Sequence, residues 1–289
     1  MSTTRADEVA RMLPRPLRAV VLVLLLTLIL GPVLYMIFAS VSSDLSVAAG
    51  HFLPRSFEPA NYLRIWSTVD LGEGLVNSLV VAGSVAVLCA FVSLLAAYVL
   101  VGFAFKGRLT ILRGLLALQS VPGTLMLLPV FVLFSSIGSV LGVPVIGTRW
   151  ALFLTYLTFG LPFSTWVMVT YLRGLPRELD EAARVDGASS WTVLTRIVLP
   201  LSWPGLVVSG IFAFLLGWND VLFASVMTNP GTRTAAVTLQ VFGATQEGGA
   251  LPLYGQLMAA ALVCAVPVVA LYLIFQRYLM SGLTSGGVK

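Results

Sequence analysis

Residues 175–204 read LPRELDEAARVDGASSWTVLTRIVLPLSWP and form the longest charged stretch between two strongly apolar segments of the chain. Pro176 fits the first position of a helix, where its missing N–H leaves no hydrogen bond unmade. Glu178, Asp180 and Glu181 follow within a turn and a half, where carboxylates are favourable against the positive end of the helix dipole. This part of the sequence therefore predicts a short helix that begins near Pro176.

Gly187 divides the stretch, because a glycine readily takes the left-handed conformation that ends a helix. After it, Ser189 or Ser190 can cap a second helix. That helix would place four aliphatic residues on one side: Leu194, Ile197, Val198 and Leu201. The pattern predicts two short helices that meet at a glycine and lie against a membrane surface, where another protein could bind them.

The composition of the chain excludes a soluble domain. Its 289 residues are 58% hydrophobic and 10% charged, and the mean hydropathy is +0.98, whereas soluble proteins carry about 25% charged residues. The net charge of +5 would fit nucleic-acid binding, but arginine gathered on the cytoplasmic side of a membrane explains it better. Cys89 and Cys264 lie in apolar runs and are interpreted as small apolar residues, and the single histidine, His51, cannot form a multi-histidine metal site.

Six apolar segments are long enough to cross a membrane, which takes about 20 residues. The predicted fold class is all-α: a polytopic membrane protein with six transmembrane helices. The expected spans are residues 19–39, 75–103, 109–137, 150–172, 205–227 and 253–275. The first is too long for the apolar part of a signal peptide and is interpreted as an uncleaved anchor. Asn77-Ser78, at the start of the second, is interpreted as a helix cap.

The chain is predicted to be a single transmembrane domain, residues 1–289, without internal repeats or a linker. Its expected parts are a cytoplasmic lead, a six-span bundle, the charged stretch between spans four and five, and a cytoplasmic tail: residues 1–18, 19–276, 175–203 and 277–289. With the amino terminus inside, only Arg55, Arg64, Arg149 and Arg233 of the 17 basic residues fall outside. Because basic residues favour the cytoplasmic side, both termini and the charged stretch are predicted to be cytoplasmic.

The charged stretch also carries a family resemblance. Glu181-Ala182-Ala183, then Asp186-Gly187-Ala188, then Leu199-Pro200 resemble the EAA loop of the membrane subunits of bacterial ABC importers. The resemblance implies that the stretch is a coupling loop, which sits in a cleft of a cytoplasmic ATPase subunit and is moved by it. An ordinary amphipathic surface loop is the alternative. The residues implied for this contact are Glu178, Glu181, Ala182, Ala183, Asp186, Gly187 and Ala188.

The last eight residues, GLTSGGVK, carry a second resemblance. They are similar to the GLTSGAVKG ending of the smaller, G-type permease subunit of maltose-type importers, in the carbohydrate-uptake branch. Gly287 stands where alanine is usual, and the last glycine is absent. The resemblance implies a tail that reaches between two ATPase subunits, and a frayed terminus is the alternative. The residues implied for the contact are Gly282, Leu283, Thr284, Ser285 and Gly286.

The motifs of an enzyme are missing. The chain has no GxxxxGK[ST] phosphate-binding loop, no HExxH and no GxSxG, so it is expected to be no enzyme and to bind neither a metal nor a cofactor. The family resemblance implies that ATP and Mg are used by partner subunits. The implied partners are two ATPase subunits, a second permease of the F type, an extracytoplasmic sugar-binding protein and the lipid bilayer, without nucleic acid. The implied location is the bacterial inner membrane.

Few polar residues fall inside the expected spans. Asp220 is the only carboxylate there, and an intramembrane charge is a functional candidate by default. The alternative is that Asn219 and Asp220 cap a broken helix near the outer surface. Trp218-Asn219-Asp220 also resembles a triplet of maltose-type permeases. Gln119 and Ser120, in the third span, either face a translocation path or make interhelical hydrogen bonds.

These features together predict a membrane-spanning permease subunit of an ATP-driven importer, which with a second permease encloses the path of a di- or oligosaccharide. By the family resemblance, specificity resides largely in the binding protein and in the other membrane subunit. Two alternatives stay open: the same architecture importing a glycerol phosphodiester or an amino sugar, and an ATP-independent carrier or channel. An intramembrane enzyme is disfavoured because Asp220 lacks a plausible catalytic partner in the sequence.

Overall fold

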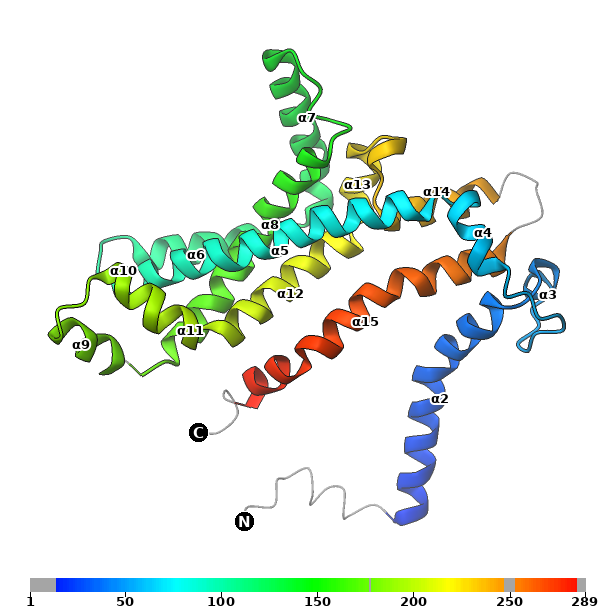
Figure 1. Cartoon of the computed structure of the whole chain (residues 1–289), viewed down its shortest axis with the longest axis horizontal. Helices are drawn as coiled ribbons and strands as arrows, with labels where there is room; N and C mark the ends of the chain where they lie inside the picture. Colours follow the sequence, from blue (N-terminus) through cyan, green and yellow to red (C-terminus); the bar gives the residue numbers. More distant parts are fainter. Residues whose placement is uncertain (1–13, 177, 247–252, 285–289) are drawn as a thin grey trace. The chain divides into compact units, whose positions relative to one another are not determined.

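The computed structural model describes residues 14–176, 178–246 and 253–284, and within them the chain is built from helices (Figure 1). The β-type pairing in these residues is an isolated bridge between Gly147 and Thr228. Five of the described helices are long and apolar enough to cross a membrane, and a sixth crossing results if the bent pair Ser190–Leu201 and Trp203–Asn219 counts as one. The predicted all-helical, polytopic character is therefore confirmed.

Two compact units make up the fold: Met1–Val69 with Phe242–Val263, and Asp70–Val241 with Cys264–Lys289. The first unit contains the expected first span, two short helices and the beginning of the last helix. These elements are α2 (Arg15–Ser40), α3 (Asp44–Ala48), α4 (Asn61–Thr68) and α15 (Tyr254–Thr284).

A small polar junction joins the helix ends of the first unit. The buried Asn61 donates from Nδ2 to the carbonyls of Ser40 and Ser42, at 3.0 and 3.1 Å. The carboxylate of Asp44 accepts the N–H of Gly255 at 2.8 Å, and burial raises the pKa of Asp44 above its ordinary value. Gly255 leaves the room for this junction, because a Cβ there would lie 2.7 Å from the Asn61 amide nitrogen.

Three long helices form the centre of the second unit, and Figure 1 shows α5 and α12 running alongside one another. They are α5 (Leu71–Gly102), α8 (Arg149–Arg173) and α12 (Trp203–Asn219). Small residues allow the close approach, as is usual between membrane helices. A Cβ at Gly160 would lie 3.0 Å from Sγ of Cys89, and one at Gly217 would lie 3.0 Å from the ring of Tyr156. The second and fourth expected spans correspond to α5 and α8.

The expected third span, residues 109–137, is wrong in its bounds. The chain forms α6 (Arg108–Gln119) and α7 (Gly123–Leu141) instead, and of these only α7 is long and apolar enough to cross a membrane. The helix breaks before Pro122 because proline has no N–H to donate and disfavours the helical conformation in the residue that precedes it.

The expected fifth and sixth spans also differ from the helices. In place of one helix over residues 205–227, α12 ends at Asn219 and α13 (Leu222–Met227) begins after a break. In place of residues 253–275, α15 continues to Thr284, so the last helix takes in the first residues of the expected tail. Apolar composition locates these segments but does not mark where a helix is interrupted.

Candidate functional site

The charged stretch folds at one end of the bundle of α5, α8 and α12 (Figure 1). We call Ser190–Leu201 the return segment. The angle between its axis and the axis of α12, which follows it, is 73°. The helices of the stretch are α9 (Glu178–Val185), α10 (Ser190–Val193), the π-helix η1 (Leu194–Val198) and α11 (Leu199–Leu201). The two short helical parts expected on either side of Gly187 are therefore present.

Gly187 makes the turn between α9 and the return segment. Its φ is +80° and a Cβ there would meet no atom within 4 Å, so the backbone conformation and not a lack of space favours glycine. The N–H of Ala188 donates to the carbonyl of Ala183 at 2.9 Å, the bond that closes a helix ending in a left-handed residue. Ala183 and Ala188 both pack against the apolar cluster that joins α5 and α8. Two alanines of the EAA-like pattern thus face the bundle.

Ser189 is the cap of the second helix, because its Oγ accepts the N–H of Thr192 at 3.2 Å. Between the two candidates left open by the sequence, Ser189 and Ser190, the structure selects the first. Leu194 and Val198 of the return segment are buried, whereas Leu201 is 41% exposed at the bend. The expected apolar side is therefore real, but it ends before Leu201.

The far surface of the stretch is exposed, and we call Val185–Trp191 the loop tip. Val185 is 88% exposed and Trp191 is 68% exposed. Apolar side chains of this size, left in water and surrounded by polar ones, are typical of a protein-binding surface. Neither residue was predicted from the sequence, although two large apolar residues on either side of a turn glycine in a charged stretch are a recognisable signal. Of the expected contact residues, Glu178, Ala182, Asp186 and Gly187 are exposed beside them, and Glu181 is exposed but borders the cavity described below.

Two tyrosines of the bundle attach the return segment at its ends. The hydroxyl of Tyr98, on α5, donates to the carbonyl of Ser190 at 3.1 Å. The hydroxyl of Tyr171, on α8, donates to the carbonyl of Leu201 at 3.1 Å. Neither tyrosine was a candidate from the sequence, because each lies within an apolar span and contacts a residue far along the chain, Ser190 for Tyr98 and Leu201 for Tyr171.

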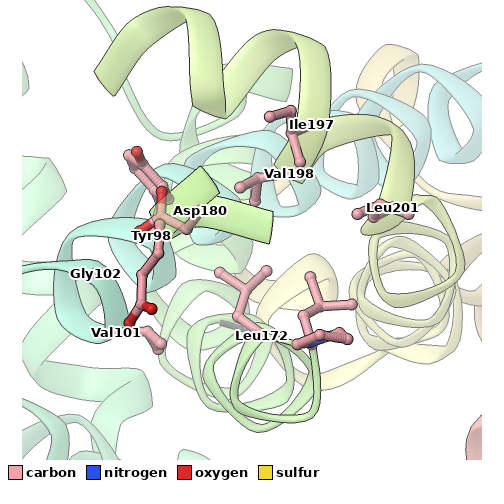
Figure 2. A pocket seen from close by; sticks show the side chains of 11 residues that line it. Tyr98, Val101, Gly102, Leu172, Asp180, Ile197, Val198 and Leu201 are labelled. Carbon is pink, nitrogen blue, oxygen red and sulfur yellow. The ribbon is translucent and has the colours of Figure 1, made fainter. Parts of the chain in front are cut away.

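A cavity of about 300 Å³ lies beneath the stretch (Figure 2). Val101 and Gly102 line it from α5 and Leu172 from α8. Asp180 and Glu181 line it from α9, so two of the carboxylates at the beginning of this helix face the bundle side. The stretch therefore rests on the bundle along part of its length and spans an open volume elsewhere.

Asp220 takes the capping position at the break after α12. Its carboxylate accepts the N–H of Ala224 at 3.0 Å and the N–H of Phe223 at 3.5 Å, and it accepts the hydroxyl of Tyr156 at 2.8 Å. Trp218 is buried and stacks on Phe214. This geometry matches the capping alternative for Asp220, while a role in translocation stays a prediction.

A second cavity, of about 380 Å³, opens midway along α8 and α12, beside the break between α6 and α7. Gln119 lines it together with Phe163, Ser164 and Phe212. Ser120 is exposed and is not among the residues of this lining. The structure thus brings Gln119, but neither Ser120 nor the triplet Trp218–Asp220, to this cavity.

The opposite end of the bundle holds the connection that follows α13 (Figure 1). Its elements are the 3-10 helix η2 (Pro230–Thr232) and α14 (Ala235–Gln246). The amide of Asn77 donates to the carbonyls of Gly231 and Arg233, at 3.3 and 2.9 Å, and the hydroxyl of Ser78 accepts the N–H of Ala235 at 2.8 Å. Because α5 begins at Leu71, the interpretation of Asn77-Ser78 as a helix cap is wrong. These side chains hold a distant loop instead.

The expected tail contact is only partly described. Gly282, Leu283 and Thr284 belong to the end of α15, and Ser285 and Gly286 lie outside the described residues. Among the described residues, no group of three or more histidine, cysteine, aspartate or glutamate side chains is placed to hold a metal ion.

Comparison with known proteins gives consistent matches. Residues 89–285 match the family described as binding-protein-dependent transport system inner membrane component. The chain is 33% identical over 270 residues to the trehalose/maltose transport system permease protein MalG of Thermococcus litoralis, covering 92% of this chain and 94% of that protein. It is 34% identical over 278 residues to the sulfoquinovosyl glycerol transport system permease protein SmoH of Agrobacterium fabrum, covering 95% and 94%.

The fold is similar to that of a chain in the crystal structure of a bacterial ABC transporter involved in the import of the acidic polysaccharide alginate. The TM-score is 0.74, with 96% of this chain and 99% of that chain covered, at 19% sequence identity. A second match, with a TM-score of 0.67 at 18% identity, is the alginate transporter in complex with a periplasmic protein that carries an alginate pentasaccharide; it covers 90% of this chain and 92% of that one. At these identities the likeness concerns the fold.

Proposed function

Because the chain belongs to the binding-protein-dependent transport system inner membrane components, we propose that it is the permease subunit of an ATP-driven sugar importer. It is a multi-pass protein of the inner membrane. In this proposal a second permease of the F type joins it to enclose the path, and an extracytoplasmic binding protein delivers a di- or oligosaccharide. Relatives named for trehalose and maltose support the sugar class.

The observation that carries the proposal is the construction of the loop tip. Gly187 lets α9 end sharply, so that Val185 and Trp191 stand exposed while Ala183 and Ala188 pack on the bundle. An exposed aromatic residue at such a turn suits a cleft in another protein, since aromatic side chains are frequent anchors of interfaces. We assign that cleft to a cytoplasmic ATPase subunit, with both termini on the same side of the membrane.

The attachment of the loop indicates how its movement reaches the path. The apolar cluster under the loop combines residues of α5, α8 and the return segment, and the return segment continues into α12. When two ATPase subunits close on ATP, each draws its loop along, and the attached spans rock from inward-facing to outward-facing, as in alternating access by rigid bodies. ATP and Mg are bound by those subunits. The cavity beside Gln119 is our candidate for the part of the path that this chain lines.

Replacement of Gly187 by valine tests the coupling role. A β-branched residue in the left-handed conformation is strained by roughly 1–2 kcal/mol, and this strain falls on the turn that shapes the tip. We expect ATP hydrolysis stimulated by the binding protein, and uptake of radiolabelled trehalose or maltose by the reconstituted complex, to fall about tenfold while the subunits still assemble. Gly142→Val is the matched control, because Gly142 has φ +68° in equally open space at the end of α7.

Three outcomes would contradict the proposal. If Gly187→Val leaves stimulated hydrolysis and uptake unchanged in an assembled complex, the turn does not couple. If the purified chain alone transports sugar into vesicles without ATP, the carrier or channel alternative is correct. If the partner binding protein binds a glycerol phosphodiester or an amino sugar and not a di- or oligosaccharide, the sugar class is wrong while the ATP-driven mechanism stands.

A further inference from the structure

The return segment is held by hydroxyl groups at both of its ends. Its first residue, Ser190, receives a hydrogen bond from Tyr98 of α5, and its last residue, Leu201, receives one from Tyr171 of α8, each at 3.1 Å. Leu201 ends α11, and the last carbonyls of a helix have no partner within it. The Tyr171 hydroxyl therefore satisfies a carbonyl that the bend into α12 leaves open.

Tyr171 touches the chain on both sides of that bend. Beyond the bend, a Cβ at Gly205 would lie 2.7 Å from Cγ of Tyr171 and 3.0 Å from one Cδ. The tyrosine ring therefore lies directly against the backbone of α12 at Gly205, in contact that any side chain there would prevent. Its hydroxyl holds α11 and its ring holds α12, so one side chain of α8 bridges the 73° bend.

The middle of the return segment packs on the bundle through Val193, Leu194 and Val198, which are buried together with residues of α5 and α8. It contains the π-helix Leu194–Val198, a form that is rare and that occurs frequently at functional sites. Val198 and Leu201 also line the cavity of about 300 Å³ beside the ends of α5 and α8. At the bend, Ser202 is fully buried and its Oγ has no hydrogen-bond partner among the described residues. Among the described residues, the bend at Ser202 is therefore held by no hydrogen bond of its own side chain, and the contacts of Tyr171 span it.

From this geometry we propose that Tyr171 is the positioning residue that fixes the angle between the return segment and α12, with Tyr98 as the second anchor. A displacement of the loop tip then turns α8 and α12 together, and Tyr98 transmits it to α5. Without the Tyr171 contact, the angle at Ser202 is free to change. A displacement of the loop tip then changes this angle and is not transmitted to α12. The inference rests on the proposed coupling function, and it assigns a role to two side chains outside the EAA-like pattern.

Conservative removal of the two hydroxyls tests the inference in the complete complex. Tyr171→Phe and Tyr98→Phe each lose one hydrogen bond and keep the ring. We expect the ratio of binding-protein-stimulated to basal ATP hydrolysis to fall roughly two- to tenfold for Tyr171→Phe, the range for a bond of ordinary strength, and less for Tyr98→Phe. Tyr62→Phe is the matched control, because its hydroxyl bonds the hydroxyl of Ser40 at 2.8 Å in the other unit; its ratio should equal that of the wild type.

A second variant tests the Tyr171 bridge from its α12 side. Gly205→Ala keeps both hydroxyls but places a methyl group where the Tyr171 ring lies. We expect the same loss of stimulation as for Tyr171→Phe, and the double variant should be no worse than either alone, since each breaks one half of the same bridge across the bend. Losses that multiply would show two independent effects and overturn the assignment of a single joint.

A distance measurement tests whether Tyr171 fixes the angle between the return segment and α12 in the absence of partner subunits. Spin labels at Val185→Cys and Phe212→Cys, with Cys89 and Cys264 replaced by alanine, report the position of α9 relative to α12 in the full chain in lipid nanodiscs. We expect the distance distribution to broaden in Tyr171→Phe and Gly205→Ala but not in Tyr62→Phe. Equal widths, with a stimulation ratio equal to the control, would overturn the inference.

A wild-type complex without any ATP-hydrolysing subunit would instead refute the proposed function. The distance distributions would still decide whether Tyr171 fixes the angle between the return segment and α12.

Discussion

The two ends of the bundle of α5, α8 and α12 are held in different ways. At the end that carries η2 and α14, Asn77, Ser78 and Tyr156 reach backbone or carboxylate groups far along the chain. At the end that carries the loop tip, two tyrosine hydroxyls hold the return segment above a cavity. The first end is held by several polar contacts that converge on distant parts of the chain. The second end is held by an apolar cluster and two hydroxyl groups beside an open volume, and we expect it to be the end that moves.

The largest effect on stability is expected from Asn77→Ala. This change removes a fully buried amide that donates to two carbonyls, and leaving those carbonyls unpaired costs about 2–4 kcal/mol in the free energy of unfolding. Thermal unfolding can be followed with a thiol-reactive dye, because Cys89 and Cys264 are both buried. Asn219→Ala, at an exposed position, is the control. A loss no greater than that of the control would show that this end is not locked as described.

Variants of Asp220 distinguish its role as a cap at the α12–α13 break from a role of its charge in translocation. Asp220→Ala removes the acceptor for Tyr156 and for the first N–H groups of α13, with an expected loss of about 1–3 kcal/mol in unfolding free energy. Asp220→Asn keeps an acceptor oxygen and should lose less. If the cap is the whole role, the asparagine variant transports at the wild-type rate. Wild-type stability combined with lost uptake would show instead that the charge acts in translocation.

Filling the cavity under the loop should affect coupling and not stability. Gly102→Leu places an aliphatic side chain into that volume, since the neighbour of an added Cβ there is the Tyr98 ring at 3.8 Å. Leucine also favours the helix over glycine by about 0.5–1 kcal/mol. We expect unchanged or higher thermal stability and a two- to threefold lower stimulation of ATP hydrolysis, on the order of half a kcal/mol. Full stimulation in this variant would show that the return segment does not move into the cavity.

The smallest effect is expected at Asp44, which holds a backbone N–H in the first unit as Asp220 does in the second. Burial raises the pKa of Asp44, so the folded state binds this proton more tightly than the unfolded state. The contribution of Asp44 to the free energy of unfolding therefore falls as pH rises from about 3.8 through the raised pKa. Asp44→Asn should remove a small part of the difference in melting temperature between pH 4 and pH 7. An unchanged or larger difference would contradict this.

The sequence predicted the helical class and the turn at Gly187 because both depend on local signals. Hydrophobic runs locate the spans, and a glycine between two helical patterns marks a left-handed turn. The breaks before Pro122 and after Asn219 were missed, since apolar composition continues through both. Tyr98 and Tyr171 could not be found from sequence alone. Their roles depend on carbonyls of Ser190 and Leu201 that only the packing of the helices brings near.

The central claim is that the loop tip is held by a subunit that hydrolyses ATP. The most direct measurement is photocrosslinking from p-benzoylphenylalanine at position 185, where Val185 is 88% exposed, in native membranes of cells that express the whole transporter. The account predicts one main crosslinked product, containing a cytoplasmic ATP-binding subunit and changing in yield when ATP is added. A product that contains the extracytoplasmic binding protein, or a tip that crosslinks to no protein, would contradict it.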